Sequence, residues 1–160
     1  MDVETWEMWS YVVTVIGLPL AIFVYVMEQR KERDNDEEEV YQLLSDNYQD
    51  FLNVVLKHSE LKLFSIHHTA DLTPEQREKM FIILSMLISL FERAYLLLYE
   101  PGMSRKQQRR WQTWEDYMHE WAARADFREM LPTLLDGEDP EFVAYMQSLV
   151  PASAKASNAP

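Results

Sequence analysis

An uncharged apolar segment near the N-terminus is the strongest pattern in the chain. Residues 8–27 contain no Asp, Glu, Lys or Arg. A helix of that length, rising about 1.5 Å per residue, matches a membrane hydrocarbon core of about 30 Å. Trp9 and Tyr25 stand near its two ends, where amphipathic rings prefer the lipid headgroup region. The pattern predicts a single transmembrane helix over residues 8–27.

The charges on either side of this segment predict its orientation. Residues 1–7 carry acidic but no basic side chains, and no small-residue cleavage site follows the segment, which argues against a cleaved signal peptide. The first basic residues after the span are Arg30, Lys31 and Arg33. Because basic residues stay on the cytoplasmic side, we expect the cytoplasmic (inner) membrane, with the N-terminus outside and the rest of the chain in the cytoplasm.

Beyond the span, apolar residues recur at three- and four-residue steps and predict a bundle of four to five helices. The expected long helices cover residues 37–57, 74–99 and 105–124. Capping boxes mark the starts of two of these helices, at Thr73 with Gln76 and at Ser104 with Gln107. A third capping box, Asp126 with Glu129, marks the start of a shorter helix that is expected to end near Gly137. Asp139-Pro140 opens a last helix.

Two features identify the expected core of this bundle. Residues 81–91 are strongly apolar, but Glu92 and Arg93 interrupt the stretch, so a core helix is favoured over a second span. These two charges are expected at the rim of the core, with a buried Glu92 paired to an arginine as the alternative. The second feature is an aromatic stripe, expected to pack against residues 81–91 and made of Trp111, Trp114, Met118 and Trp121.

Composition agrees with an all-α fold. The 160 residues include only 3 Gly against 5 Trp, 8 Tyr, 7 Phe and 9 Met, a balance poor in tight turns and rich in bulky residues that helices accept. The expected organisation is an external N-terminus, a transmembrane helix, a charged juxtamembrane stalk, a cytoplasmic helical domain and a disordered tail. These parts cover residues 1–7, 8–27, 28–39, 40–150 and 151–160.

Small side chains line one face of the predicted span, at Ser10, Thr14, Gly17 and Ala21. Small residues let two membrane helices approach closely, so this packing face predicts a homo-oligomer or a partner protein bound through the span. Pro19 frees a backbone carbonyl close by, which a neighbouring helix would help to satisfy. Chance spacing is the competing interpretation, because small residues are common in spans.

A basic cluster opens the helix expected at residues 105–124, and its members are Arg105, Lys106, Arg109 and Arg110. The N-terminus of a helix is already positive, so an anion is expected beside them. The candidates are anionic lipid and the acidic residues 34–39 of this or another copy. Nucleic acid is disfavoured, because the net charge is -12 and the neighbouring Trp residues are expected in the core. A solvated basic face without a ligand is the alternative.

The sequence contains no complete pattern of catalytic or metal-binding residues. Cysteine is absent, which removes thiolate sites. Adjacent His67 and His68 would converge on a metal only within a loop, and Asp116 with His119 forms only half of a two-metal site. There is no Gly-rich phosphate loop and no recognisable nucleophile with its base. We therefore expect no enzyme activity, no cofactor and no bound metal.

Five short motifs carry a resemblance to other proteins. They are Tyr48-Gln49-Asp50-Phe51, His58-Ser59-Glu60-Leu61, Phe91-Glu92-Arg93-Ala94-Tyr95, Trp111-Gln112-Thr113-Trp114-Glu115-Asp116-Tyr117 and Asp139-Pro140-Glu141-Phe142. Together they resemble a loosely defined group of uncharacterised bacterial proteins with one N-terminal transmembrane helix and a cytoplasmic all-helical domain. The resemblance covers most of residues 40–150. It implies the fold and the anchor, and it implies no activity and no site.

These patterns predict a membrane-anchored, non-enzymatic interaction protein, an accessory subunit or scaffold of a membrane complex. The alternative is a membrane-tethered stress or defence sensor or effector that binds anionic lipid or nucleic acid through the basic cluster. A metalloenzyme is the second alternative and has the least support, because the sequence offers no complete set of ligands.

Overall fold

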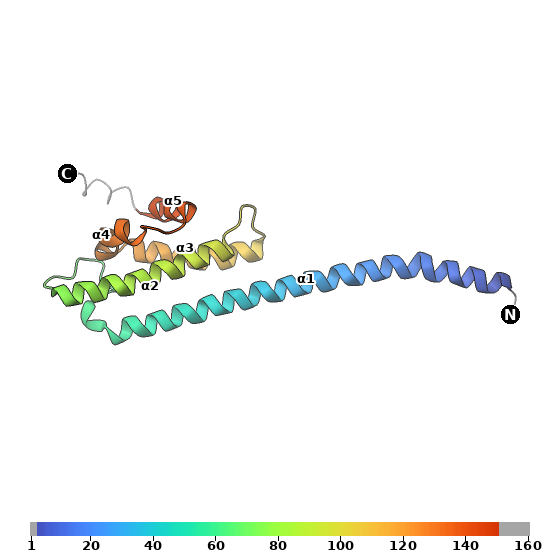
Figure 1. Cartoon of the computed structure of the whole chain (residues 1–160), viewed down its shortest axis with the longest axis horizontal. Helices are drawn as coiled ribbons and strands as arrows, with labels where there is room; N and C mark the ends of the chain where they lie inside the picture. Colours follow the sequence, from blue (N-terminus) through green and yellow to red (C-terminus); the bar gives the residue numbers. More distant parts are fainter. Residues whose placement is uncertain (1–2, 151–160) are drawn as a thin grey trace. The chain divides into compact units, whose positions relative to one another are not determined.

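The computed structural model describes residues 3–150, with side chains from Leu18 onward. This part of the chain forms five α-helices, one short 3-10 helix and no strand (Figure 1). The elements are α1 (Val3–Lys57), η1 (Ser59–Leu61), α2 (Pro74–Leu98), α3 (Arg105–Ala122), α4 (Ala125–Leu134) and α5 (Pro140–Leu149). The all-α prediction is confirmed for these residues, and each expected long helix ends within a turn of its predicted end.

The chain divides into two compact units, Met1–Val40 and Tyr41–Pro160. In the first unit, α1 continues through Pro19 and through the charged residues beyond the apolar segment. Every side chain of residues 18–27 is exposed. Farther along, Arg33 Nε lies 4.0 Å from Glu37 Oε1, an ion pair between successive turns of the helix.

The second unit is built around α2. Helices α3, α4 and α5 all contact it, and its buried side chains include Leu87, Ile88 and Phe91. Among the described residues, α2 is the one helix long and apolar enough to cross a membrane by length and composition, and 44% of its apolar window is buried. A helix with a covered apolar face is the core helix of a bundle, as the sequence predicts for α2. The structure does not describe the side chains of residues 8–17, which belong to the predicted N-terminal span.

The aromatic stripe of α3 lies in the core, as expected. Trp111, Trp114 and Trp121 are each no more than 3% exposed. Several helices cover the stripe rather than α2 alone, among them α5, whose Tyr145 ring centroid lies 5.6 Å from that of Trp111. The ring centroid of Trp111 lies 5.9 Å from that of Tyr95 on α2, and the centroid of Trp121 lies 5.6 Å from that of Phe51 on α1. The C-terminal part of α1 shares this role because it has its own apolar face to cover.

Local capping starts three of the helices where the sequence predicts. Both hydrogen bonds of the capping box are present at Thr73 with Gln76 and at Ser104 with Gln107. The Asp139 side chain accepts the N–H groups at the start of α5. These contacts satisfy backbone donors that have no partner inside the helix.

The third predicted capping box, Asp126 with Glu129, is wrong. The N-cap of α4 is Arg124, which makes no side-chain cap, and the helix ends at Leu134. Asp126 lies inside the first turn, and its carboxylate bonds to the loop before α2 instead of capping its own helix. Gly137 follows the helix with a φ of +92°, a conformation that glycine adopts without strain.

Candidate functional site

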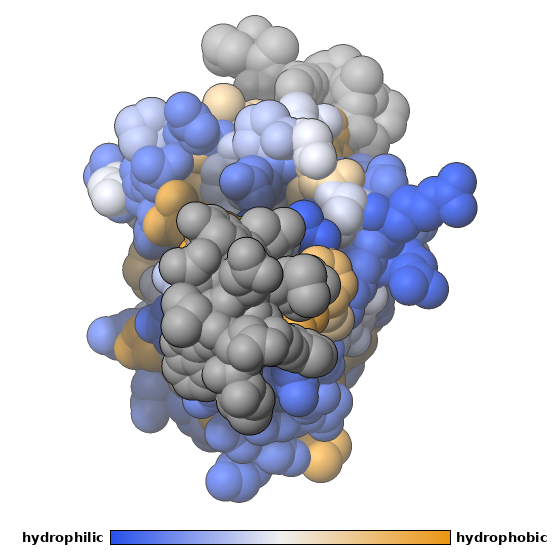
Figure 2. Space-filling view, turned by 90° about the vertical axis from the view of Figure 1, so that its right-hand side faces the viewer, coloured by the Kyte–Doolittle hydropathy of each residue, from blue (hydrophilic) through white to orange (hydrophobic). Residues whose placement is uncertain are grey.

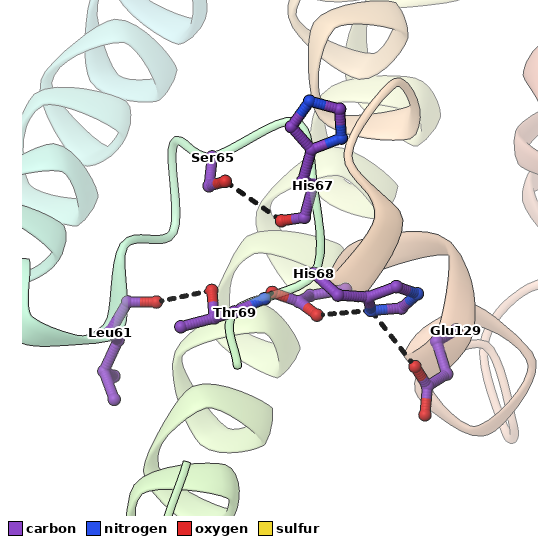
Figure 3. Close-up of polar contacts among 7 residues, drawn as sticks. Leu61, Ser65, His67, His68, Thr69 and Glu129 are labelled. Carbon is purple, nitrogen blue, oxygen red and sulfur yellow. Dashed lines mark hydrogen bonds and ion pairs between the residues drawn. The ribbon is translucent and has the colours of Figure 1, made fainter. Parts of the chain in front are cut away.

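The loop that follows η1 is tied to the start of α4. The Ala125 N–H donates to the Ile66 carbonyl at 3.0 Å, and the Thr69 N–H donates to Asp126 Oδ2, also at 3.0 Å. The Thr69 hydroxyl donates in turn to the Leu61 carbonyl at 3.3 Å (Figure 3). These bonds place the residue before Thr69 beside the first turns of α4.

That residue is His68, and it meets two carboxylates of α4. His68 Nδ1 lies 2.7 Å from Asp126 Oδ1 and 3.4 Å from Glu129 Oε2. The His68 and Glu129 side chains are 60% and 63% exposed, whereas Asp126 is only 16% exposed. The His67 ring points away from this cluster (Figure 3), and the His67 carbonyl accepts from the Ser65 hydroxyl. Within the described part of the chain, this is the one group of at least three potential metal ligands that converges.

Sequence reasoning missed this cluster. It assigned Asp126 and Glu129 to a capping box and considered His68 only together with His67. A carboxylate pair three residues apart lies on one side of a helix, and this spacing is the only local signal that the sequence offers. The partner histidine lies 58 residues before Asp126, so only the fold brings the two together.

Glu129 also lines an open pocket of about 580 Å³ between α2 and α4. Apolar side chains such as Phe81 and Met130 share its wall with Arg77 and Glu78. The pocket therefore places groups of both charges beside an apolar surface, next to the His68 cluster.

The four residues of the predicted basic cluster do not share one environment. Arg105, Lys106 and Arg109 are exposed. Arg110 is half-buried, and its guanidinium carbon lies 5.6 Å from the centroid of the Tyr41 ring. A cation held over a ring in this way contributes to packing within the second unit. Three of the four cations thus face solvent at the start of α3.

Two other groups of residues were considered as sites, the packing face of the predicted span and the pair Asp116 with His119. In the predicted packing face of the span, Ala21 is exposed, and the side chains of Ser10, Thr14 and Gly17 lie outside the described ones. Asp116 and His119, considered as half of a metal site, are both exposed on α3.

Glu92 joins the C-terminal half of α2 to the start of α5. It is half-buried, and its Oε1 accepts the Asp139 N–H at 2.6 Å, while Arg93 is exposed, as expected at the rim. For a buried Glu92, the sequence predicts an arginine as its partner. In the structure the partner of Glu92 is instead the Asp139 N–H group at the start of α5. Burial, followed by the hydrogen bond to Glu92 and its negative charge, raises the pKa of Glu138 to about 7. A protonated Glu138 carboxyl group therefore donates a hydrogen bond to Glu92, close to the start of α5.

This carboxyl pair predicts that the second unit loses stability as pH rises. With a pKa raised from 4.5 to about 7, Glu138 binds more protons in the folded state between these values. The penalty for ionising it is therefore absent below about pH 4.5 and complete above about pH 7. Glu138→Gln should raise the free energy of unfolding at pH 8 by an amount on the order of 1 kcal/mol, allowing for solvent screening, and much less at pH 5.

Thermal unfolding of Glu138→Gln and the unsubstituted chain at the two pH values checks this prediction. Asp136→Asn, at an exposed acid nearby, is the matched control and should have little effect at either pH. An equal effect of Glu138→Gln at pH 5 and pH 8 would show that its carboxyl group does not titrate in this range.

No family model, curated protein or solved structure matches the chain.

Proposed function

We propose that this chain is a membrane-anchored, non-enzymatic interaction protein, an accessory subunit or scaffold of a membrane complex. The observation that carries the proposal is the exposure of residues 18–27, which are all uncharged. Leu18, Phe23 and Val24 are 63%, 60% and 46% exposed, and the helical repeat directs them to different sides of α1. A helix that is apolar all round is stable when lipid or protein surrounds it.

The residues that follow are suited to the polar side of a bilayer. The Gln29 amide donates to the Tyr25 hydroxyl at 2.9 Å, which gives the polar end of that ring a partner beyond the last apolar turn. The exposed Arg30, Lys31 and Arg33 come next, and their charge favours the cytoplasmic side. Hydrophilic residues predominate among those drawn in colour in Figure 2. By the orientation of the span, the second unit then lies in the cytoplasm.

The proposed partner binds through the span, at the packing face of Ser10, Thr14, Gly17 and Ala21. Lipid tails are as apolar as the side chains of a span, so membrane helices associate mainly by close packing of small residues. Pro19 inside α1 removes one backbone donor and leaves a carbonyl that a neighbouring helix helps to satisfy. A second copy of this chain or the span of another subunit would supply that helix.

Gly17→Leu tests the proposal, because it keeps the span apolar while placing a bulky side chain on the packing face. We expect the variant to insert into the membrane and its association to weaken at least tenfold, or about 1.4 kcal/mol. Val12→Leu, on the opposite side of the helix, is the control. The measurement is recovery of the oligomer or co-purifying partner in mild detergent, at equal amounts of membrane-inserted chain. Full recovery with Gly17→Leu would leave the span as an anchor only, without an intramembrane partner.

The exposed cations at the start of α3 favour a second candidate function. Arg105, Lys106 and Arg109 would let a tethered domain bind anionic lipid, as in a stress or defence sensor or effector. The net charge of -12 continues to disfavour nucleic acid. If the purified chain binds phosphatidylserine vesicles and no protein partner co-purifies with it, this second function is favoured over the first.

A further inference from the structure

The His68 cluster has no part in the proposed anchor or packing face. We infer that His68, Asp126 and Glu129 bind one divalent transition-metal ion, which fastens the loop after η1 to α4. Such an ion would act within the second unit, whether or not the proposed membrane function holds. The role is binding and not catalysis.

The spacing of the ligand atoms suits a metal ion. One nitrogen of His68 and one oxygen of each carboxylate all lie within 4.8 Å of one another. Metal–ligand distances of about 2.0–2.2 Å in a tetrahedral site separate neighbouring ligand atoms by about 3.4 Å. His68 Nδ1 lies 3.4 Å from Glu129 Oε2, which matches that separation, and 2.7 Å from Asp126 Oδ1. An ion would take the place of the proton between His68 Nδ1 and Asp126 Oδ1. To reach the tetrahedral separation, these two atoms would have to move apart by less than about 1 Å.

Asp126 is held ready for this role by a contact outside the set of ligands. The Thr69 N–H donates to Asp126 Oδ2 at 3.0 Å, which leaves Oδ1 directed at His68. Hydrogen bonds from the surrounding protein orient a ligating carboxylate and strengthen metal binding. Glu129 follows on the same side of α4, so the helix fixes the spacing of the two carboxylates.

The ligand chemistry indicates the class of ion. An imidazole suits Zn²⁺ and similar transition-metal ions, whereas Mg²⁺ and Ca²⁺ prefer sites made only of oxygen. Two carboxylates with a neutral imidazole balance the charge of a divalent ion. The exposed side chains of His68 and Glu129 leave space for water molecules to complete the coordination.

A metal-free ion pair between His68 and the carboxylates would also hold the loop in place. Under either explanation, loss of the His68 ring should loosen the loop, so the stability of variants does not distinguish the two. Direct measurement of metal binding does.

Calorimetric titration with Zn²⁺ of the untagged full-length chain, treated with chelator and held in mild detergent, tests the site. We expect one equivalent to bind, and His68→Ala and Glu129→Gln each to weaken binding at least tenfold. His67→Ala is the matched control, because the His67 ring points away from the cluster (Figure 3), and it should bind as the unsubstituted chain does.

Absence of Zn²⁺ binding at micromolar concentrations would overturn the inference. So would the same affinity in the unsubstituted chain, His68→Ala and Glu129→Gln, which would place the ion on other surface groups. If His68→Ala does not fold, Glu129→Gln decides, since Glu129 is an exposed residue of α4 and its substitution leaves the core intact. Zn²⁺ binding and the co-purification of a membrane partner are separate measurements, so failure of one leaves the other standing.

Discussion

Replacing Trp121 by alanine should lower the free energy of unfolding of the second unit by about 3–5 kcal/mol. The side chain is fully buried, and its ring centroid lies 5.6 Å from that of Phe51 and 5.2 Å from that of Phe64. Its Nε1–H donates to the Tyr48 hydroxyl at 3.1 Å, so truncation also leaves a buried hydroxyl without this donor. A loss of this size is a large fraction of the stability of a small domain.

Urea unfolding of the full-length chain in mild detergent, followed by near-ultraviolet circular dichroism, measures this effect. Leu56→Ala is the control, because Leu56 is 74% exposed and its truncation should change the free energy of unfolding by no more than about 0.5 kcal/mol. If Trp121→Ala unfolds at the same urea concentration as the control, the aromatic stripe does not form the core.

Local patterns predicted the helices and much of the core, because each depends on residues close together in the sequence. A capping box such as that of Thr73 needs only a side chain and an N–H group three residues away. The stripe from Trp111 to Trp121 needs only helical spacing to identify the buried face of α3. Neither feature depends on how the helices are arranged in space.

Contacts between distant segments determined what the sequence did not predict. Asp126 has the residue type and spacing of an N-cap, but the Thr69 N–H from the distant loop binds its carboxylate. Arg124 closes the helix predicted at residues 105–124, and no sequence pattern indicates its burial, yet it is 5% exposed, and its guanidinium carbon lies 4.6 Å from the centroid of the Phe64 ring. Both partners come from the loop before α2, which carries no periodic pattern of its own. The candidate metal site lies at the same junction, and for that reason the sequence did not reveal it.

The burial of α2 agrees with the charges at Glu92 and Arg93, which indicate a core helix and not a second membrane span. Helix α2 is apolar enough to cross a membrane, but side chains such as Leu87 and Phe91 are buried against the rest of the second unit. Residues 18–27 of α1 are apolar and exposed on every side. This difference in burial is the reason that we propose α1, and not α2, as the membrane anchor.

The central claim is that residues 8–27 cross the membrane and leave the second unit in the cytoplasm. Cysteine labelling in intact cells tests it most directly, because the chain contains no cysteine and a single introduced thiol has no competitor within it. Thr5→Cys should react with a membrane-impermeant maleimide in intact cells. Ser157→Cys should react only after the cells are made permeable, since the basic residues after the proposed span favour the cytoplasmic side.

Reaction of Ser157→Cys but not of Thr5→Cys in intact cells would contradict the orientation. If neither variant reacts until the cells are permeable, and an alkaline wash releases both from the membrane fraction, the chain has no membrane span.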